Sequence, residues 1–153
     1  MDSLPDGSIA VCVAGQIKYM SGQIFYKFRQ ASDFWYLTGF EEPDAAVILE
    51  KRPSSPRGYH MTLFSVGSDA LKEKWEGART SPDDVVRHFH ADDAQPISAF
   101  PPALKKFAAS ADHIYVDIPS TSSSKRARAV SPRSLLKYLS PSGGCRARIM
   151  IVS

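Results

Sequence analysis

The chain has 153 residues, of which 43% are hydrophobic and 23% charged, a composition typical of one globular domain with a sizeable apolar core. No apolar run approaches the roughly 18 residues that a membrane-spanning helix needs, which excludes that class of protein. The formal net charge of +3 combines two opposite parts, because all 16 acids lie at or before Asp117 whereas seven Lys and Arg follow it.

The start of the chain and its cysteines bear on the cellular compartment. Residues 1–7 carry acid and proline where a signal or transit peptide carries basic residues. We therefore expect a cytoplasmic protein, or a mitochondrial one if the start has been trimmed. Cys12 and Cys145 show neither metal-ligand spacing nor a disulfide framework. Reduced thiols are the expectation.

Four short apolar runs predict β-strands in the first half of the chain. Residues 8–13 follow a Pro-Asp-Gly turn and are rich in β-branched side chains, and residues 34–37 end at a Thr-Gly pair. Residues 45–49 are apolar without interruption, as in strands buried on both faces. A loop with two prolines, 51–58, then leads into residues 59–66. There Tyr59, Met61 and Leu63 alternate with His60, Thr62 and Phe64, as side chains on the two faces of a strand do.

Helices are predicted mainly after this point, over residues 68–76, 81–89, 101–109 and 131–140, with a further strand at 114–117. The strongest start signal is Ser81-Pro82-Asp83-Asp84, where serine can cap the helix, proline suits the first helical position and an acid follows. Strands interleaved with helices predict an α/β layer structure. Residues 120–124 are serine-rich and predict a loop.

Two blocks carry a family resemblance. Residues 28–49 read Phe-Arg-Gln-Ala-Ser-Asp-Phe-Trp-Tyr-Leu-Thr-Gly-Phe-Glu-Glu-Pro-Asp-Ala-Ala-Val-Ile-Leu and resemble the N-terminal domain of Xaa-Pro aminopeptidases, the aminopeptidase P family. Residues 72–79, Lys-Glu-Lys-Trp-Glu-Gly-Ala-Arg, are similar to the family's second block. The approach to the first block resembles the eukaryotic intermediate-cleaving branch, although Lys27 stands where proline is usual. Two blocks in this order seldom match by chance.

The resemblance implies a fold and a separation of functions between two domains. It covers residues 4–118 as a single α/β domain with a mixed β-sheet and helices on both faces, and residues 119–153 form a basic, Ser-rich extension. In the family, peptide cleavage and its manganese reside in a second, C-terminal domain whose ligand blocks are missing from these 153 residues. The resemblance therefore implies a non-catalytic domain for subunit assembly and substrate-pocket completion, inactive alone.

Several residues of the first block are expected to be structural. The aromatics of the predicted strand 34–37 alternate across it and are expected to lie chiefly in the core, Gly39 should permit a backbone conformation denied to other residues, and Arg29 and Asp33 can pair at a spacing of four. The full set of family-motif positions is Arg29, Gln30, Asp33, Phe34, Trp35, Tyr36, Gly39 and Pro43.

Trp75 in the second block has two interpretations. It lies in a charge-rich helical stretch, where an exposed indole is unfavourable. By resemblance it reaches the active site of a neighbouring subunit and walls the substrate pocket, with Arg79 in support. Alternatively, it packs on its own domain as a helix anchor. The sequence leaves both open.

No catalytic or metal site is predicted within the chain. His88 and His90, with Asp92 and Asp93 nearby, are the best metal candidates, but helical positions two apart point about 200° apart and cannot share an ion. Histidines also suit a helix C-terminus because of its dipole. We therefore interpret them as a solvated helix end. No Ser/His/Asp, Cys/His or phosphate-binding motif has convincing spacing.

Other classes of function stay open. Related inactive proteins include histone chaperones, so a stand-alone module for peptides or histones is one alternative, and a truncated fragment without function is another. The seven cations after Asp117 would allow salt-sensitive contacts to nucleic-acid phosphates. Serine-rich sequence seldom builds a base-reading surface, so a solvated extension is the competing expectation. The partners expected are a second copy or a catalytic aminopeptidase chain.

Overall fold

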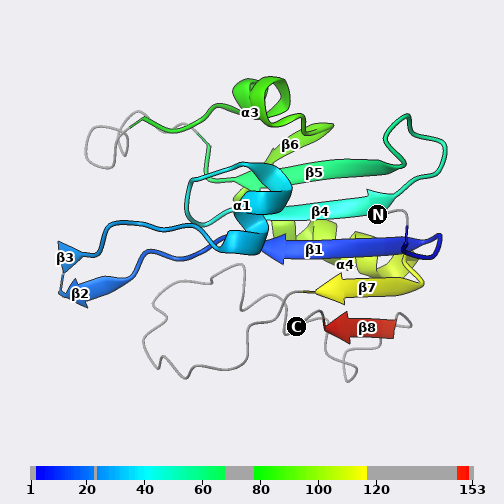
Figure 1. Cartoon of the computed structure of the whole chain (residues 1–153), viewed down its shortest axis with the longest axis horizontal. Helices are drawn as coiled ribbons and strands as arrows, with labels where there is room; N and C mark the ends of the chain where they lie inside the picture. Colours follow the sequence, from blue (N-terminus) through cyan, green and yellow to red (C-terminus); the bar gives the residue numbers. More distant parts are fainter. Residues whose placement is uncertain (1–2, 23, 68–77, 117–147, 152–153) are drawn as a thin grey trace.

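The fold is a six-stranded mixed sheet covered by helices on both faces, seen in a computed structural model that describes residues 3–22, 24–67, 78–116 and 148–151 (Figure 1). The strand order is β6-β5-β4-β1-β7-β8. The sheet strands are β1 (Ser8–Val13), β4 (Ala46–Lys51), β5 (Tyr59–Ser65), β6 (Asp93–Pro96), β7 (His113–Val116) and β8 (Arg148–Ile151). The helices are α1 (Ser32–Thr38), α3 (Pro82–Phe89), a 3₁₀ turn η1 (Ile97–Ala99) and α4 (Phe100–Ser110).

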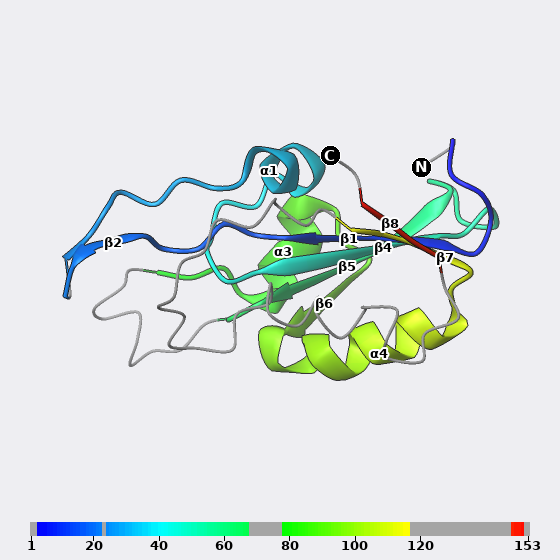
Figure 2. The ribbon, with the colours of Figure 1, turned by 90° about the horizontal axis from the view of Figure 1, so that it is seen from below.

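Strand directions make the sheet mixed, as expected. The β1–β4 and β4–β5 pairs are antiparallel, whereas β1–β7, β5–β6 and β7–β8 are parallel. Helix α1 lies on one face and α4 on the opposite face (Figure 2). This confirms the α/β prediction with both faces covered. Among the described residues, no helix is long and apolar enough to cross a membrane.

Each face of the sheet builds its own core cluster. One cluster joins Phe100, Leu104 and Ala108 of α4 to strand side chains such as Ile48. The other joins Phe34 of α1 and Val85 of α3 to strand side chains on the opposite face of the sheet, including Val47 and Leu63. Residues 46–49 are buried on both sides, which confirms the interpretation of the uninterrupted apolar run.

Most predicted elements are confirmed. The Ser81 hydroxyl accepts a hydrogen bond from the Asp84 N–H at 3.3 Å, with proline in the first turn, and the helix ends at Phe89 as expected. The next residue, His90, is exposed and takes a positive φ of 55° at the C-cap. The predicted helices at 68–76 and 131–140 and the loop at 120–124 lie outside the described residues.

The predicted strand at 34–37 is wrong, because these residues lie within helix α1. Phe34 and Thr38, four apart, share the buried helical face, and the Thr38 hydroxyl donates to the Phe34 carbonyl at 2.7 Å. The prediction that the aromatics lie chiefly in the core is also wrong. Phe34 is 1% exposed, whereas Trp35 is 51% and Tyr36 85% exposed. A helix of seven residues buries one face, whereas a covered strand would bury both.

The C-terminal segment contains a strand that the sequence did not predict. Residues 148–151 form β8, which extends the sheet parallel to β7. No strand was expected at these four residues of the extension. Their sequence, Arg-Ile-Met-Ile, has the β-branched content of a strand. Its placement depends on the open edge of β7.

A carboxylate clamp joins the β4–β5 loop to the end of α3 and the start of β6. Asp92 accepts hydrogen bonds from the Met61 N–H at 2.7 Å and from Arg57, which also donates to the His90 carbonyl at 2.7 Å. Burial by itself would raise the pKa of the Asp92 carboxyl, but the hydrogen bond from Met61, the Arg57 guanidinium and the His60 ring hold that pKa below its usual range.

Asp92→Asn preserves side-chain shape and removes the charge. Because the native pKa is depressed, ionised Asp92 stabilises the fold above the usual aspartate pKa of about 3.9, and this contribution disappears as the pH falls through the native value. We expect the variant to lose about 1–2 kcal/mol of unfolding free energy at neutral pH and to lose less stability than wild type on acidification. Urea unfolding across this pH range measures both. Asp112→Asn, at an exposed aspartate, is the control. If the unfolding free energies of wild type and Asp92→Asn fell equally on acidification, the depressed pKa of Asp92 would be contradicted.

Candidate functional site

The Gln30 carboxamide organises the region before and after α1. Its Oε1 accepts from the N–H groups of Gly15 at 2.6 Å and Ala31 at 2.9 Å. Its Nε2 donates to the carbonyls of Phe40 at 3.1 Å and Glu42 at 2.9 Å. One side chain thus joins the segment after β1, the start of α1 and the segment after α1. An amide suits this position because it carries both an acceptor and donors.

Gly15 and Gly39 permit this close arrangement. A Cβ at Gly15 would lie 3.2 Å from the Ala31 nitrogen and the Arg29 carbonyl oxygen, so the two segments approach closely there. Gly39 ends α1 with φ 67°, and its N–H donates to the Trp35 carbonyl at 2.7 Å. This left-handed C-cap confirms the expectation for Gly39.

An open hollow of about 620 Å³ lies beside α1. The side chains of Trp35 and Tyr36 supply its aromatic part, and Asp33 and Glu41 supply two carboxylates. Arg29 contributes one cation. Arg29 and Asp33, which can pair by spacing, form no ion pair within the described part of the chain. Both are therefore available to other groups.

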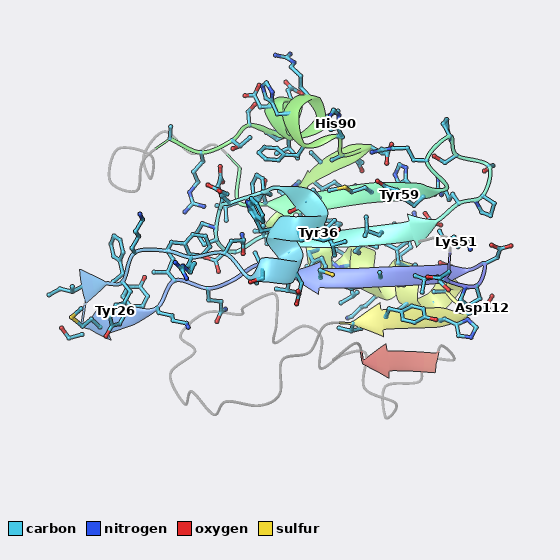
Figure 3. All side chains as sticks on the ribbon, viewed as in Figure 1. Tyr26, Tyr36, Lys51, Tyr59, His90 and Asp112 are labelled. Carbon is cyan, nitrogen blue, oxygen red and sulfur yellow. The ribbon has the colours of Figure 1, made fainter. Side chains whose placement is uncertain are left out.

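A second apolar surface lies on the arm, defined here as residues 16–22 and 24–28, which contain the hairpin strands β2 (Tyr19–Ser21) and β3 (Ile24–Phe25). The arm projects away from the sheet (Figure 1). Five of its large apolar side chains are more than half exposed, namely Tyr19, Met20, Ile24, Phe25 and Tyr26, whereas Ile17 and Phe28 are half-buried. Figure 3 places Tyr26 at one end of the molecule and Asp112 at the other.

The second block of the motif is only partly described. Trp75 lies outside the described residues. Arg79 is half-buried, and the adjacent Thr80 donates through both its N–H and its hydroxyl to Glu42 Oε1, each at 2.6 Å. The end of this block is thereby tied to the segment that Gln30 also binds. Pro43 is half-buried in the turn before β4.

The structure brings together residues that the sequence listed separately, and adds others. Gln30, Phe34 and Gly39 shape the α1 region from within, whereas Arg29, Asp33, Trp35 and Tyr36 line the hollow. The arm and the Glu42–Thr80 tie were missed. The signal for the arm was present: apolar residues around Gly22 without an acid among them.

The resemblance places manganese in a second domain and not in this one. Among the described residues, no three His, Cys, Asp or Glu side chains lie together as a metal would require. The ionisable groups of the hollow are two acids and one arginine. No metal-dependent step is assigned to them.

Comparisons with known proteins give a consistent result. The family model described as "Aminopeptidase P, N-terminal domain" matches residues 1–115. Intermediate cleaving peptidase 55 of Saccharomyces cerevisiae is 34% identical over 135 residues, covering 88% of this chain and 26% of the relative. The mitochondrial Intermediate cleaving peptidase 55 of Arabidopsis thaliana is 30% identical over 122 residues, covering 80% and 24%. Zinc-substituted Escherichia coli aminopeptidase P in complex with product superposes with a TM-score of 0.73 at 30% identity, covering 97% and 33%.

Gln30→Ala removes all four hydrogen bonds of the carboxamide. We expect the free energy of unfolding to fall by about 2–4 kcal/mol, because backbone groups from three segments lose a partner in a partly buried setting. Gln16→Ala, at an exposed glutamine, is the matched control and should change stability by less than about 0.5 kcal/mol. Urea unfolding followed by circular dichroism measures both. If both variants lowered the free energy of unfolding by the same small amount, the Gln30 hydrogen bonds would contribute little to stability.

Proposed function

The chain belongs to the aminopeptidase P family through its N-terminal domain, and from this we propose that it is a non-catalytic domain that binds a catalytic aminopeptidase portion and completes its substrate pocket. The curated relatives described above extend well beyond the match, since the chain spans 26% and 24% of their lengths. The remaining part of such a relative is the partner that this domain would bind.

The observation that carries the proposal is the apolar surface of the arm and α1. Soluble proteins seldom expose large contiguous apolar patches without a binding role. Phe25 is 62%, Trp35 51% and Tyr36 85% exposed, although the same domain buries Phe34 almost completely. The domain thus has a satisfied core and a separate surface suited to association.

Pocket completion is the finer part of the proposal. We assign it to Trp75 and Arg79, by their match to the second family block. The double hydrogen bond from Thr80 to Glu42 supports this role, because it fixes the end of the block to the domain beside the hollow. The catalytic portion would supply the manganese ligands and cleave residues before an N-terminal penultimate proline. A mitochondrial location is favoured over a cytoplasmic one by the similarity to the Arabidopsis relative, which is named as mitochondrial.

A domain exchange tests the proposal. In yeast Intermediate cleaving peptidase 55, this chain would replace the quarter of the protein that it matches. We expect the chimera to cleave Xaa-Pro peptides in the presence of manganese, whereas the yeast protein without that quarter and this chain alone should not. Release of the N-terminal residue is followed by mass spectrometry. A soluble, folded chimera without activity, or chelator-sensitive cleavage by the pure chain alone, would contradict the proposal.

Trp75→Ala in the active chimera separates the two interpretations of this tryptophan. A pocket wall predicts a rise in KM by about tenfold or more with unchanged thermal stability, because aromatic anchors at interfaces typically contribute about 2 kcal/mol or more. A helix anchor predicts lost stability with KM unchanged. Arg79→Ala is compared with Arg87→Ala, an exposed arginine of α3. Equal kinetics of these two variants would remove Arg79 from the pocket.

A further inference from the structure

The hollow beside α1 holds charged side chains that the fold does not use. No hydrogen bond or ion pair of the described part of the chain engages the side chain of Arg29, Asp33 or Glu41. All three are exposed and line this hollow of about 620 Å³. The next residue, Glu42, differs, because its carboxylate accepts both hydrogen bonds from Thr80. One of two adjacent acids is therefore structural, and the other lines the hollow.

Stabilisation of helix α1 does not account for both carboxylates of the hollow. Asp33 lies in the first turn of α1, where a negative charge interacts favourably with the helix dipole. Glu41 follows the C-cap Gly39, at the end where the dipole disfavours an acid. Two acids from opposite ends of one short helix nevertheless line the same hollow. Their shared surroundings point to a common ligand of positive charge.

Aromatic surface lies beside these charges. Trp35 and Tyr36 line the hollow and are 51% and 85% exposed, and Figure 3 labels Tyr36 on α1. The face of an aromatic ring attracts a cation, and a nearby carboxylate adds a second attraction. A guanidinium or ammonium group on an aliphatic chain can use both. Arg29 supplies donors that the carbonyl oxygens of a peptide accept. This combination fits a peptide that carries a basic side chain.

The charge of the domain favours the same class of ligand. All 16 acids lie at or before Asp117, whereas seven of the 19 Lys and Arg lie after it, so the part of the chain that builds the hollow is net acidic. Such a field raises the local concentration of cationic ligands and repels acidic ones. The volume of the hollow agrees as well, because ligand pockets typically enclose about 300–1,000 Å³.

We propose that the α1 hollow binds an arginine or lysine side chain of a peptide. The aliphatic part of that side chain packs on Trp35 and Tyr36, and its charge lies beside the carboxylates of Asp33 and Glu41. The hollow is then a subsite that selects basic sequences among the peptides brought to the catalytic portion. This deepens the proposed function, and its claim about substrates rests on that function. The binding itself belongs to this chain and is measured without a catalytic portion.

Peptide binding by the complete 153-residue chain tests the site. The probe is a short peptide of arginine, leucine and alanine that is blocked at both ends and carries a fluorescent label. Matched peptides have glutamine or glutamate in place of arginine. Fluorescence anisotropy measures the dissociation constants. We expect the arginine peptide to bind at least about tenfold more tightly than either matched peptide, and to bind more weakly as salt is added.

Substitutions in the hollow identify the contact. The hollow variant combines Asp33→Asn and Glu41→Gln and should weaken binding of the arginine peptide about fivefold or more. The control variant combines Asp83→Asn and Asp112→Asn, which removes the same charge at exposed positions elsewhere, and should weaken binding less than about twofold. Circular dichroism confirms that both are folded. Equal weakening by the two variants would show a general charge effect and overturn the proposal, as would equal binding of all three peptides.

Tyr36→Ala tests the aromatic part of the site separately. It should weaken binding of the arginine peptide about threefold or more, because a cation–π contact is lost. Val86→Ala, at an apolar side chain of α3 that is 43% exposed, should leave the dissociation constant unchanged. Binding that is the same with and without Tyr36 would place the peptide elsewhere and overturn the proposal.

The basic segment of the same chain is the rival occupant of the hollow. A variant with Lys125→Gln, Arg126→Gln and Arg128→Gln lacks three of its cations. If that segment occupied the hollow, its weakening would let the arginine peptide bind several-fold more tightly, and the gain would be absent when the hollow variant carries the same changes. That result would overturn the proposal. An unchanged dissociation constant supports a separate peptide as the ligand.

Kinetics of the domain exchange connect the site to substrates. In an active chimera, the hollow variant should raise KM about fivefold for an Xaa-Pro peptide with arginine among its later residues. KM for the same peptide with glutamine there should stay unchanged, as should kcat for both. An equal rise in KM for the two peptides, with lower thermal stability, would assign the hollow to the contact with the catalytic portion and overturn the proposal. An inactive chimera would contradict the proposed function, whereas the ligand of the hollow is decided by the binding assay.

Discussion

The Gln30 carboxamide is the interaction on which the surface features of this domain depend. Its four hydrogen bonds hold the segment after β1, the start of α1 and the segment after α1 in one place. Each bonded group is backbone, so the side chain replaces the regular pairing that these segments lack. Together with the packing of buried Phe34, these bonds fix where α1 begins relative to the sheet.

From this tie follow both the buried and the exposed sides of α1. Phe34 enters the core cluster of one sheet face and Thr38 closes the last turn, while Gly39 reverses the chain. Trp35 and Tyr36 must then point away from the core. The same constraint directs the arm outward, because residues 29–31 are held against Gly15. Exposure of aromatic surface is thus a consequence of the packing.

The two faces of the domain differ in how fully their apolar side chains are covered. The α4 face is a closed core, in which Phe64 and Phe100 pack edge to face with centroids 5.3 Å apart. The α1 face carries the arm, the hollow and the anchored end of the second family block. This packed scaffold positions the exposed surface on which the proposed role depends.

The sequence by itself determined the α/β class, strands β1, β4, β5 and β7, helices α3 and α4, and the family, because these depend on local signals: β-branched and apolar runs, the Ser81-Pro82 and Pro101-Pro102 starts and two motif blocks. Only the tertiary structure decided that residues 34–37 are helical. An aromatic run fits a strand or a helix equally well, and the choice depends on what Gln30 and Phe34 meet from distant parts of the chain. The same holds for β8, whose four residues become a strand because the edge of β7 offers unpaired backbone groups. Local pattern predicts elements, whereas long-range pairing decides which face of each is covered.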